Sequence, residues 1–197
     1  TYPRDFLRQH PTATVDVVEI DPGMTEIARN YFSLTEDPRL IIHHDDGRMF
    51  LSRTKESYDV IYGDAFNSVF SLPYQLTTQE AVSRMHELLD EDGVVLVKIV
   101  SSLEGKRSQF LRAEYHTYRS VFPQVYLFPV NGAANPTQIQ NLILVALKST
   151  TPPSFTSDNP EWQAYLNTRW IKEIPQDLPL LTDDHAPVDQ YIMRALL

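Results

Sequence analysis

Three short apolar runs in the first third of the chain each end in carboxylates. The runs span residues 15–20 (VDVVEI), 40–44 (LIIHH) and 58–62 (YDVIY). The acids that close them are Glu19 with Asp21, Asp45 with Asp46, and Asp64. Segments with helical spacing of apolar residues separate the runs, which is typical of a β-α-β-α-β unit with a parallel sheet. Because ligands bind outside the carboxyl ends of such strands, we expect the acids to line one cleft.

The composition narrows the ligands that an acidic cleft would take. Carboxylates only accept hydrogen bonds, so they suit ribose hydroxyls, an exocyclic amine or a cationic substrate. A net charge of −9 argues against nucleic acid as a partner, because phosphate binding needs a basic surface. The chain contains no cysteine, which excludes disulfides and thiolate chemistry. No apolar run approaches a membrane span and no signal peptide is recognisable, so we expect a cytoplasmic protein that acts on small molecules.

The length of 197 residues predicts a single catalytic-type domain over residues 1–197. We expect an α/β core over residues 1–148 and a loop and tail over residues 149–197 that pack back on it. The last two strands, near residues 125–130 and 141–147, are expected to pair antiparallel.

Local residues mark two helix starts and one turn. Asp21 before Pro22 predicts a cap followed by proline at the first helical position. Thr77 with Glu80 predicts a capping box. Residues 90–93 predict a turn before a buried strand. Of the adjacent acids Asp45 and Asp46, we expect Asp45 to cap the following helix and Asp46 to face the ligand.

Two groups of histidine and aspartate are superficially similar to metal sites. His43 and His44 are adjacent in a strand, so their side chains point to opposite faces, and we expect no metal there. Asp183 and His185 lie in the tail. Since the chain has no Gly-x-Ser-x-Gly motif, a serine hydrolase is not expected, and we expect the tail to order itself through hydrogen bonds of its aspartates.

Five sequence segments occur in the order found in one enzyme family. They are VVEIDPGMTEIARNYF (17–32), HDDGRMFL (44–51), YDVIYGDAFNS (58–68), LTTQEAV (76–82) and LTDDHAPVDQY (181–191). The chain resembles the catalytic domain of the spermidine synthase-like polyamine aminopropyltransferases. The resemblance implies a Rossmann-like, class I methyltransferase-type α/β fold, with a mostly parallel sheet and an antiparallel strand near the end.

The resemblance assigns the donor site to residues of the first two acidic strand ends. Glu19 matches the acid that holds the ribose hydroxyls of the nucleoside. Asp46 matches the residue that receives the adenine amino group, and Gly47 beside it belongs to the same site. The resemblance implies decarboxylated S-adenosylmethionine, or S-adenosylmethionine, as a co-substrate, with no permanently bound cofactor.

The resemblance assigns the acceptor site to the third strand end and the loop beyond it. Asp64 matches the central acid, which binds the acceptor amine and assists its deprotonation. Asn67 stands where the family carries a second aspartate, and it is a candidate acceptor-site or turn residue. Tyr74 and Gln75 are candidates for lining the acceptor pocket, or else for core or surface positions.

The resemblance also shows what departs from the family pattern. The family's glycine-rich loop and the strand before it would precede Thr1, so we expect this chain to lack the amino-terminal part. We therefore expect either upstream residues or association, including a homo-oligomer, to cover the sheet edge. The implied function is aminopropyl transfer to an amine. A methyltransferase that uses S-adenosylmethionine and a non-catalytic domain of the same fold remain the alternatives.

Overall fold

The computed structural model describes residues 2–64 and 73–196, with side chains up to Met193. Its internal contacts group into two compact units, Thr1–Thr54 and Lys55–Leu197, which are described in turn. The prediction of a single domain over the whole chain stays a prediction. No helix among the described residues is long and apolar enough to cross a membrane.

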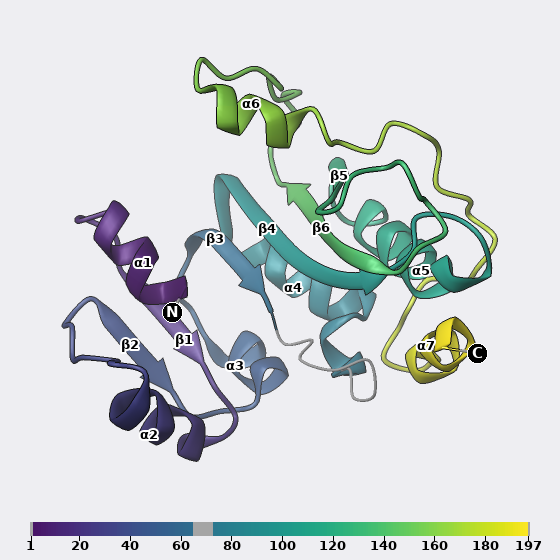
Figure 1. The fold of residues 1–197 in the computed structure, drawn as a ribbon. Coiled ribbons are helices and arrows are strands. Elements are labelled where there is room, and N and C mark those ends of the chain that lie inside the picture. The colour runs from purple at the N-terminus through teal and green to yellow at the C-terminus, as the bar shows by residue number, and fades with distance from the viewer. Residues whose placement is uncertain (1, 65–72, 197) are drawn as a thin grey trace. The chain divides into compact units, whose positions relative to one another are not determined.

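The first unit is a β-α-β motif with one flanking helix on each side in the sequence (Figure 1). Its elements are α1 (Tyr2–Gln9), β1 (Val15–Val18), α2 (Pro22–Tyr31), β2 (Leu40–His43) and α3 (Gly47–Arg53). The strands pair in parallel, from Val15 opposite Leu40 to Val18 opposite His43. The β-α-β alternation predicted from the apolar runs is therefore confirmed.

The N-terminus of α2 is capped by Asp21, as the sequence predicts. The Asp21 side chain accepts a hydrogen bond from the Gly23 backbone N–H at 2.8 Å, and Pro22 occupies the first helical position.

The first unit has few buried side chains. Among its described residues only Leu7 and Thr25 are buried.

The second unit is built on a four-stranded sheet in the order β3-β4-β6-β5 (Figure 1). Its strands are β3 (Tyr58–Gly63), β4 (Leu89–Ser101), β5 (Gln124–Pro129) and β6 (Gln140–Leu147). Its helices are η1 (Tyr74–Leu76), α4 (Gln79–Leu88), η2 (Lys106–Ser108), α5 (Gln109–Arg119), α6 (Pro160–Leu166) and α7 (Val188–Leu196). β3 and β4 are parallel, whereas β6 runs antiparallel to both β4 and β5. The predicted antiparallel strand near the end is confirmed as β6.

The core of this unit follows the alternation of its central strands. Every second residue is buried from Gly93 to Ser101 of β4 and along all of β6, including Val95, Ile99 and Leu144. α4 and α5 contribute the other side of this core through residues such as Val82 and Leu111. Burial of each such side chain contributes about 1.5–3 kcal/mol to folding.

The tail is tied to the core by specific hydrogen bonds. Arg112 on α5 is almost fully buried and binds both carboxylate oxygens of Asp177, at 2.8 and 3.1 Å. The Leu181 backbone N–H donates to Thr117 Oγ1 at 2.9 Å, and its carbonyl accepts from the Gln79 N–H at 2.7 Å. These contacts join the tail to α5 and to the start of α4.

The start of α4 differs from the predicted capping box. Thr78, not Thr77, is the N-cap, and its Oγ1 accepts from the Ala81 N–H at 3.4 Å. The same hydroxyl donates to Asp183 of the tail at 2.6 Å. Glu80 accepts from the Asp183 backbone N–H at 3.0 Å instead of closing a box on Thr77. The expected ordering of the tail by an aspartate is confirmed here.

The predicted turn at residues 90–93 is also wrong. These residues belong to β4, where the pairing with β3 shifts from Tyr58 opposite Leu89 to Val60 opposite Val94. The extra residues form an irregularity within the strand, which is how a sheet accommodates an insertion without ending the ladder.

A buried acid lies on α5. Glu114 is 1% exposed, and neither of its carboxylate oxygens has a hydrogen-bond partner among the described residues. Burial raises the pKa of Glu114 well above its ordinary value, because a charged carboxylate loses its hydration there. In the folded chain, Glu114 therefore stays protonated at pH values well above its ordinary pKa.

Candidate functional site

Glu19 lies directly after β1, beside the start of α2. Its backbone N–H continues the sheet by donating to the His43 carbonyl at 3.0 Å. Its Oε1 accepts from the Asp21 backbone N–H at 2.9 Å, while Asp21 itself caps α2. Oε2 of Glu19 has no hydrogen-bond partner among the described residues. One oxygen thus orients the half-buried side chain, and the other is available to accept from a ligand.

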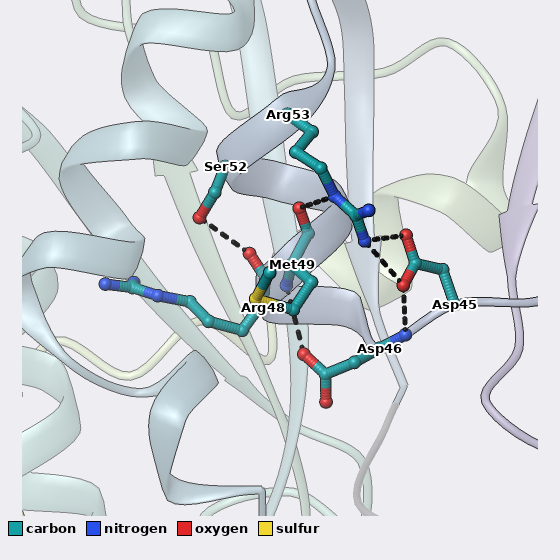
Figure 2. Close-up of polar contacts among 6 residues, drawn as sticks. All are labelled: Asp45, Asp46, Arg48, Met49, Ser52 and Arg53. Atoms are coloured by element: carbon teal, nitrogen blue, oxygen red, sulfur yellow. Dashed lines mark hydrogen bonds and ion pairs between the residues drawn. The ribbon is translucent and has the colours of Figure 1, made fainter.

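Asp46, rather than Asp45, caps the helix that follows the two acids, and Asp45 forms an ion pair with Arg53 (Figure 2). Asp46 is the N-cap of α3, and its Oδ1 accepts from the Met49 N–H at 3.0 Å. Asp45 accepts from the Asp46 N–H at 2.9 Å and pairs through both oxygens with Arg53, at 2.6 and 2.8 Å. The prediction that Asp45 caps this helix is wrong. The helix begins at Gly47, so Asp46, the residue before it, is the cap. The carboxylate of Asp45 is instead bound by Arg53.

Asp46 keeps one oxygen available in spite of its capping role. Its Oδ2 has no hydrogen-bond partner among the residues that the structure describes. Glu19 and Asp46 follow neighbouring parallel strands that are in register at Val18 and His43. Both acids therefore lie at the same end of the two-stranded sheet. In each acid, one carboxylate oxygen accepts a hydrogen bond from a backbone N–H at a helix start, and the other oxygen is available to a ligand.

The two histidines do not share a ligand. His43 Nε2 lies 3.0 Å from Asp16 Oδ1, and its ring packs on Phe50. His44 Nε2 lies 3.0 Å from Thr25 Oγ1. Across the described parts of the chain, no group of three or more His, Cys, Asp or Glu side chains is arranged to hold a metal ion.

Asp64 belongs to the second unit and follows β3. Its Oδ1 forms an ion pair with Nζ of Lys98, which lies on the neighbouring strand β4. The side chains are 42% and 27% exposed, respectively. Sequence reasoning missed Lys98. The available signal was a single lysine inside the otherwise apolar segment of residues 94–100.

The other acceptor candidates also belong to the second unit. Tyr74 and Gln75 lie on η1, where Tyr74 is 51% exposed and its carbonyl accepts from the backbone N–H and the hydroxyl of Thr77. Gln75 is half-buried. Asn67 lies outside the described residues. The structure therefore places the donor candidates Glu19, Asp46 and Gly47 together in one unit and the described acceptor candidates in the other.

Comparison with known proteins identifies relatives of this chain. The family model of the spermine/spermidine synthase domain matches residues 5–159. A polyamine aminopropyltransferase of Vibrio vulnificus is 29% identical over 153 residues, which cover 76% of this chain and 48% of that protein. A probable polyamine aminopropyl transferase of Bifidobacterium longum is 28% identical, over 100% of this chain and 47% of that protein. The chain spans about half the length of these curated relatives.

Solved structures show the same fold. A probable spermidine synthase from Corynebacterium glutamicum superposes with a TM-score of 0.69 at 24% identity, over 84% of this chain and 57% of that one. Human methyltransferase-like protein 13, solved in complex with SAH, superposes with a TM-score of 0.58 at 22% identity, over 84% of this chain and 73% of that one. The fold is thus the Rossmann-like fold that spermidine synthases and methyltransferases share.

Proposed function

Since this chain belongs to the spermine/spermidine synthase family, we propose that the full-length protein transfers an aminopropyl group from decarboxylated S-adenosylmethionine to an amine. The observation that carries the proposal is the pair of acids at one end of the first sheet. Glu19 and Asp46 each keep one carboxylate oxygen available and have the other fixed by a backbone N–H. Two fixed acceptors at adjacent strand ends suit a nucleoside, which presents hydroxyl and amino donors.

On the donor side, Glu19 accepts hydrogen bonds from the ribose hydroxyls and Asp46 accepts one from the adenine amino group. Gly47, the first residue of α3, adjoins the base. Bonds to a charged acceptor are roughly twice as strong as neutral ones, which favours these contacts over water. The SAH complex of the human methyltransferase-like protein 13 supports an adenosyl ligand for this fold.

On the acceptor side, Asp64 binds the amine and takes its proton. The neutral nitrogen attacks the carbon next to the sulfonium, a new C–N bond forms and the C–S bond breaks. Methylthioadenosine leaves with the bonding electrons. Tyr74 and Gln75 line this side. The reaction needs no covalent intermediate, so the protein contributes alignment, proton removal and exclusion of water.

Calorimetry on the full-length protein tests the function and the donor together. We expect methylthioadenosine and decarboxylated S-adenosylmethionine to bind, and aminopropyl transfer to an amine to follow with the second. Tighter binding of S-adenosylmethionine, with methyl transfer, would instead identify a methyltransferase. Absence of binding by all three would identify a non-catalytic domain of the same fold.

Glu19 is tested by substitution with glutamine, which keeps the size of the side chain and removes its charge. We expect Glu19→Gln to weaken methylthioadenosine binding by about 1.5–3 kcal/mol, the scale of a hydrogen bond to a charged group. Calorimetry measures this change. Glu26→Gln, on an exposed position of α2, is the matched control and should bind as the native protein does. Equal affinity of Glu19→Gln and Glu26→Gln would remove Glu19 from the site.

A further inference from the structure

Asp64 is already paired with a cation. Lys98 lies one residue beyond Val97, which is opposite Gly63 in the parallel ladder, so the two strands bring the ammonium beside the carboxylate. Val97 and Ile99 on either side of Lys98 are buried, and Lys98 is opposite Ile143 on β6. The backbone of Lys98 is therefore held in the middle of a sheet, between two neighbouring strands.

This pairing changes what the acid attracts. An isolated carboxylate presents a charge of −1 to an approaching ammonium group, whereas the pair of Asp64 and Lys98 is neutral. A second ammonium that approaches the lysine meets Coulomb repulsion, which strengthens as the local dielectric falls. A diamine or triamine must accept that repulsion or displace Lys98 from Asp64.

An acceptor with both charges does not face this conflict. Its ammonium group binds Asp64, and its carboxylate binds Lys98, so one ion pair is replaced by two. Like-charge contact excludes the wrong partner while opposite charges bind the right one, which is how binding sites gain specificity.

We propose that Lys98 is a specificity-determining residue that selects a zwitterionic acceptor, an amine with a carboxylate in the same molecule, over a diamine or triamine. The inference rests on the proposed role of Asp64 in binding the acceptor amine. It names the acceptor class that the family assignment leaves open.

Two amines with the same spacer test the proposal. 5-Aminopentanoate and 1,4-diaminobutane share one amine and four methylene groups, and they differ only in the far group, a carboxylate or an ammonium. Each is titrated by calorimetry into the full-length protein. We expect the native protein to bind 5-aminopentanoate at least about tenfold tighter than 1,4-diaminobutane, a difference of roughly 1.4 kcal/mol.

Lys98→Gln should abolish or reverse this preference, because the neutral amide neither attracts the carboxylate nor repels the second ammonium. Lys98→Met is a second variant for the case in which Lys98→Gln does not fold. Lys172→Gln is the matched control, since Lys172 pairs with Glu104 at 2.9 Å elsewhere in the same unit. This control should keep the native preference.

Several results would overturn the proposal. They are equal or tighter binding of 1,4-diaminobutane by the native protein, the same ratio in the native and Lys98 variants, and no binding of either amine by any variant. Methylthioadenosine binding separates this outcome from failure of the proposed function. Intact nucleoside binding with unchanged amine selectivity contradicts the role of Lys98 alone. Lost nucleoside binding with the expected amine selectivity contradicts the donor assignment alone.

Discussion

Replacing Asp64 by asparagine in the full-length protein should lower the rate of aminopropyl transfer roughly 10²–10⁴-fold, the usual contribution of a positioned base. An aliphatic amine is mostly protonated at neutral pH, and only its neutral form attacks the carbon next to the sulfonium. Asparagine can accept a hydrogen bond from the amine but cannot take its proton. Binding of methylthioadenosine should stay at the native value, because the nucleoside contacts that we propose lie on Glu19 and Asp46.

Single-turnover measurements separate the chemical step from binding and product release. Asp59→Asn is the matched control, since Asp59 is an exposed acid on the same strand, β3. It should react at the native rate. A near-native rate for Asp64→Asn would show that water or another group removes the proton.

Replacing the buried Glu114 by methionine should remove a pH dependence of stability. Its raised pKa means that the folded chain binds a proton that the unfolded chain releases above its ordinary pKa of about 4.5. The stability that this group contributes is fully present below pH 4.5 and is lost as the pH rises toward the folded pKa. The loss is on the order of 1 kcal/mol per pH unit. Methionine neither titrates nor leaves two buried oxygens without partners.

Urea unfolding between pH 4.5 and 8 measures this effect. Trp162 and Trp170 both belong to the unit that contains Glu114, so their fluorescence reports on the relevant part of the chain. We expect Glu114→Met to gain stability over the native protein as the pH rises. Glu91→Met, at an exposed position of β4, is the control and should keep the native slope. Parallel pH profiles for Glu114→Met and the native protein would contradict the prediction.

The order of helices and strands was predictable because it depends on local patterns. Apolar runs of five or six residues predicted β1, β2 and β3, and helical spacing of apolar residues predicted the helices between them. The last two strands were expected to pair antiparallel, and β5 and β6 do so. The division into domains and the roles of the site residues depend on contacts between segments far apart in the sequence. Neither the apolar runs nor the helical spacing reports such contacts.

One error occurred where a distant contact decides between neighbouring residues. Thr77 and Thr78 are equally suited to cap a helix by composition. The structure uses Thr78, whose hydroxyl also binds Asp183, 105 residues away in the sequence. The expectation that Asp45 caps α3 was wrong for a local reason, because the helix begins at Gly47 and the residue directly before it, Asp46, is therefore the cap.

Lys98 shows how register limits prediction from sequence. A lysine inside an apolar strand is visible in the sequence, but its partner depends on which residues of β3 and β4 are opposite each other. The irregularity at residues 90–93 shifts that register between Tyr58 and Val60. Without the shift, a different residue of β4 would lie beside Asp64.

The sparse core of the first unit has a thermodynamic consequence for nucleoside recognition. Glu19 and Asp46 belong to a unit in which only Leu7 and Thr25 are buried among the described residues. Segments with few buried apolar contacts open locally at low free energy. A ligand that binds only the closed form adds a stabilisation of RT ln(1 + [L]/Kd) to it. For residues 1–197 we therefore expect ordering of this unit and occupancy of the proposed nucleoside site to be coupled equilibria, so that part of the intrinsic binding free energy offsets the cost of local ordering.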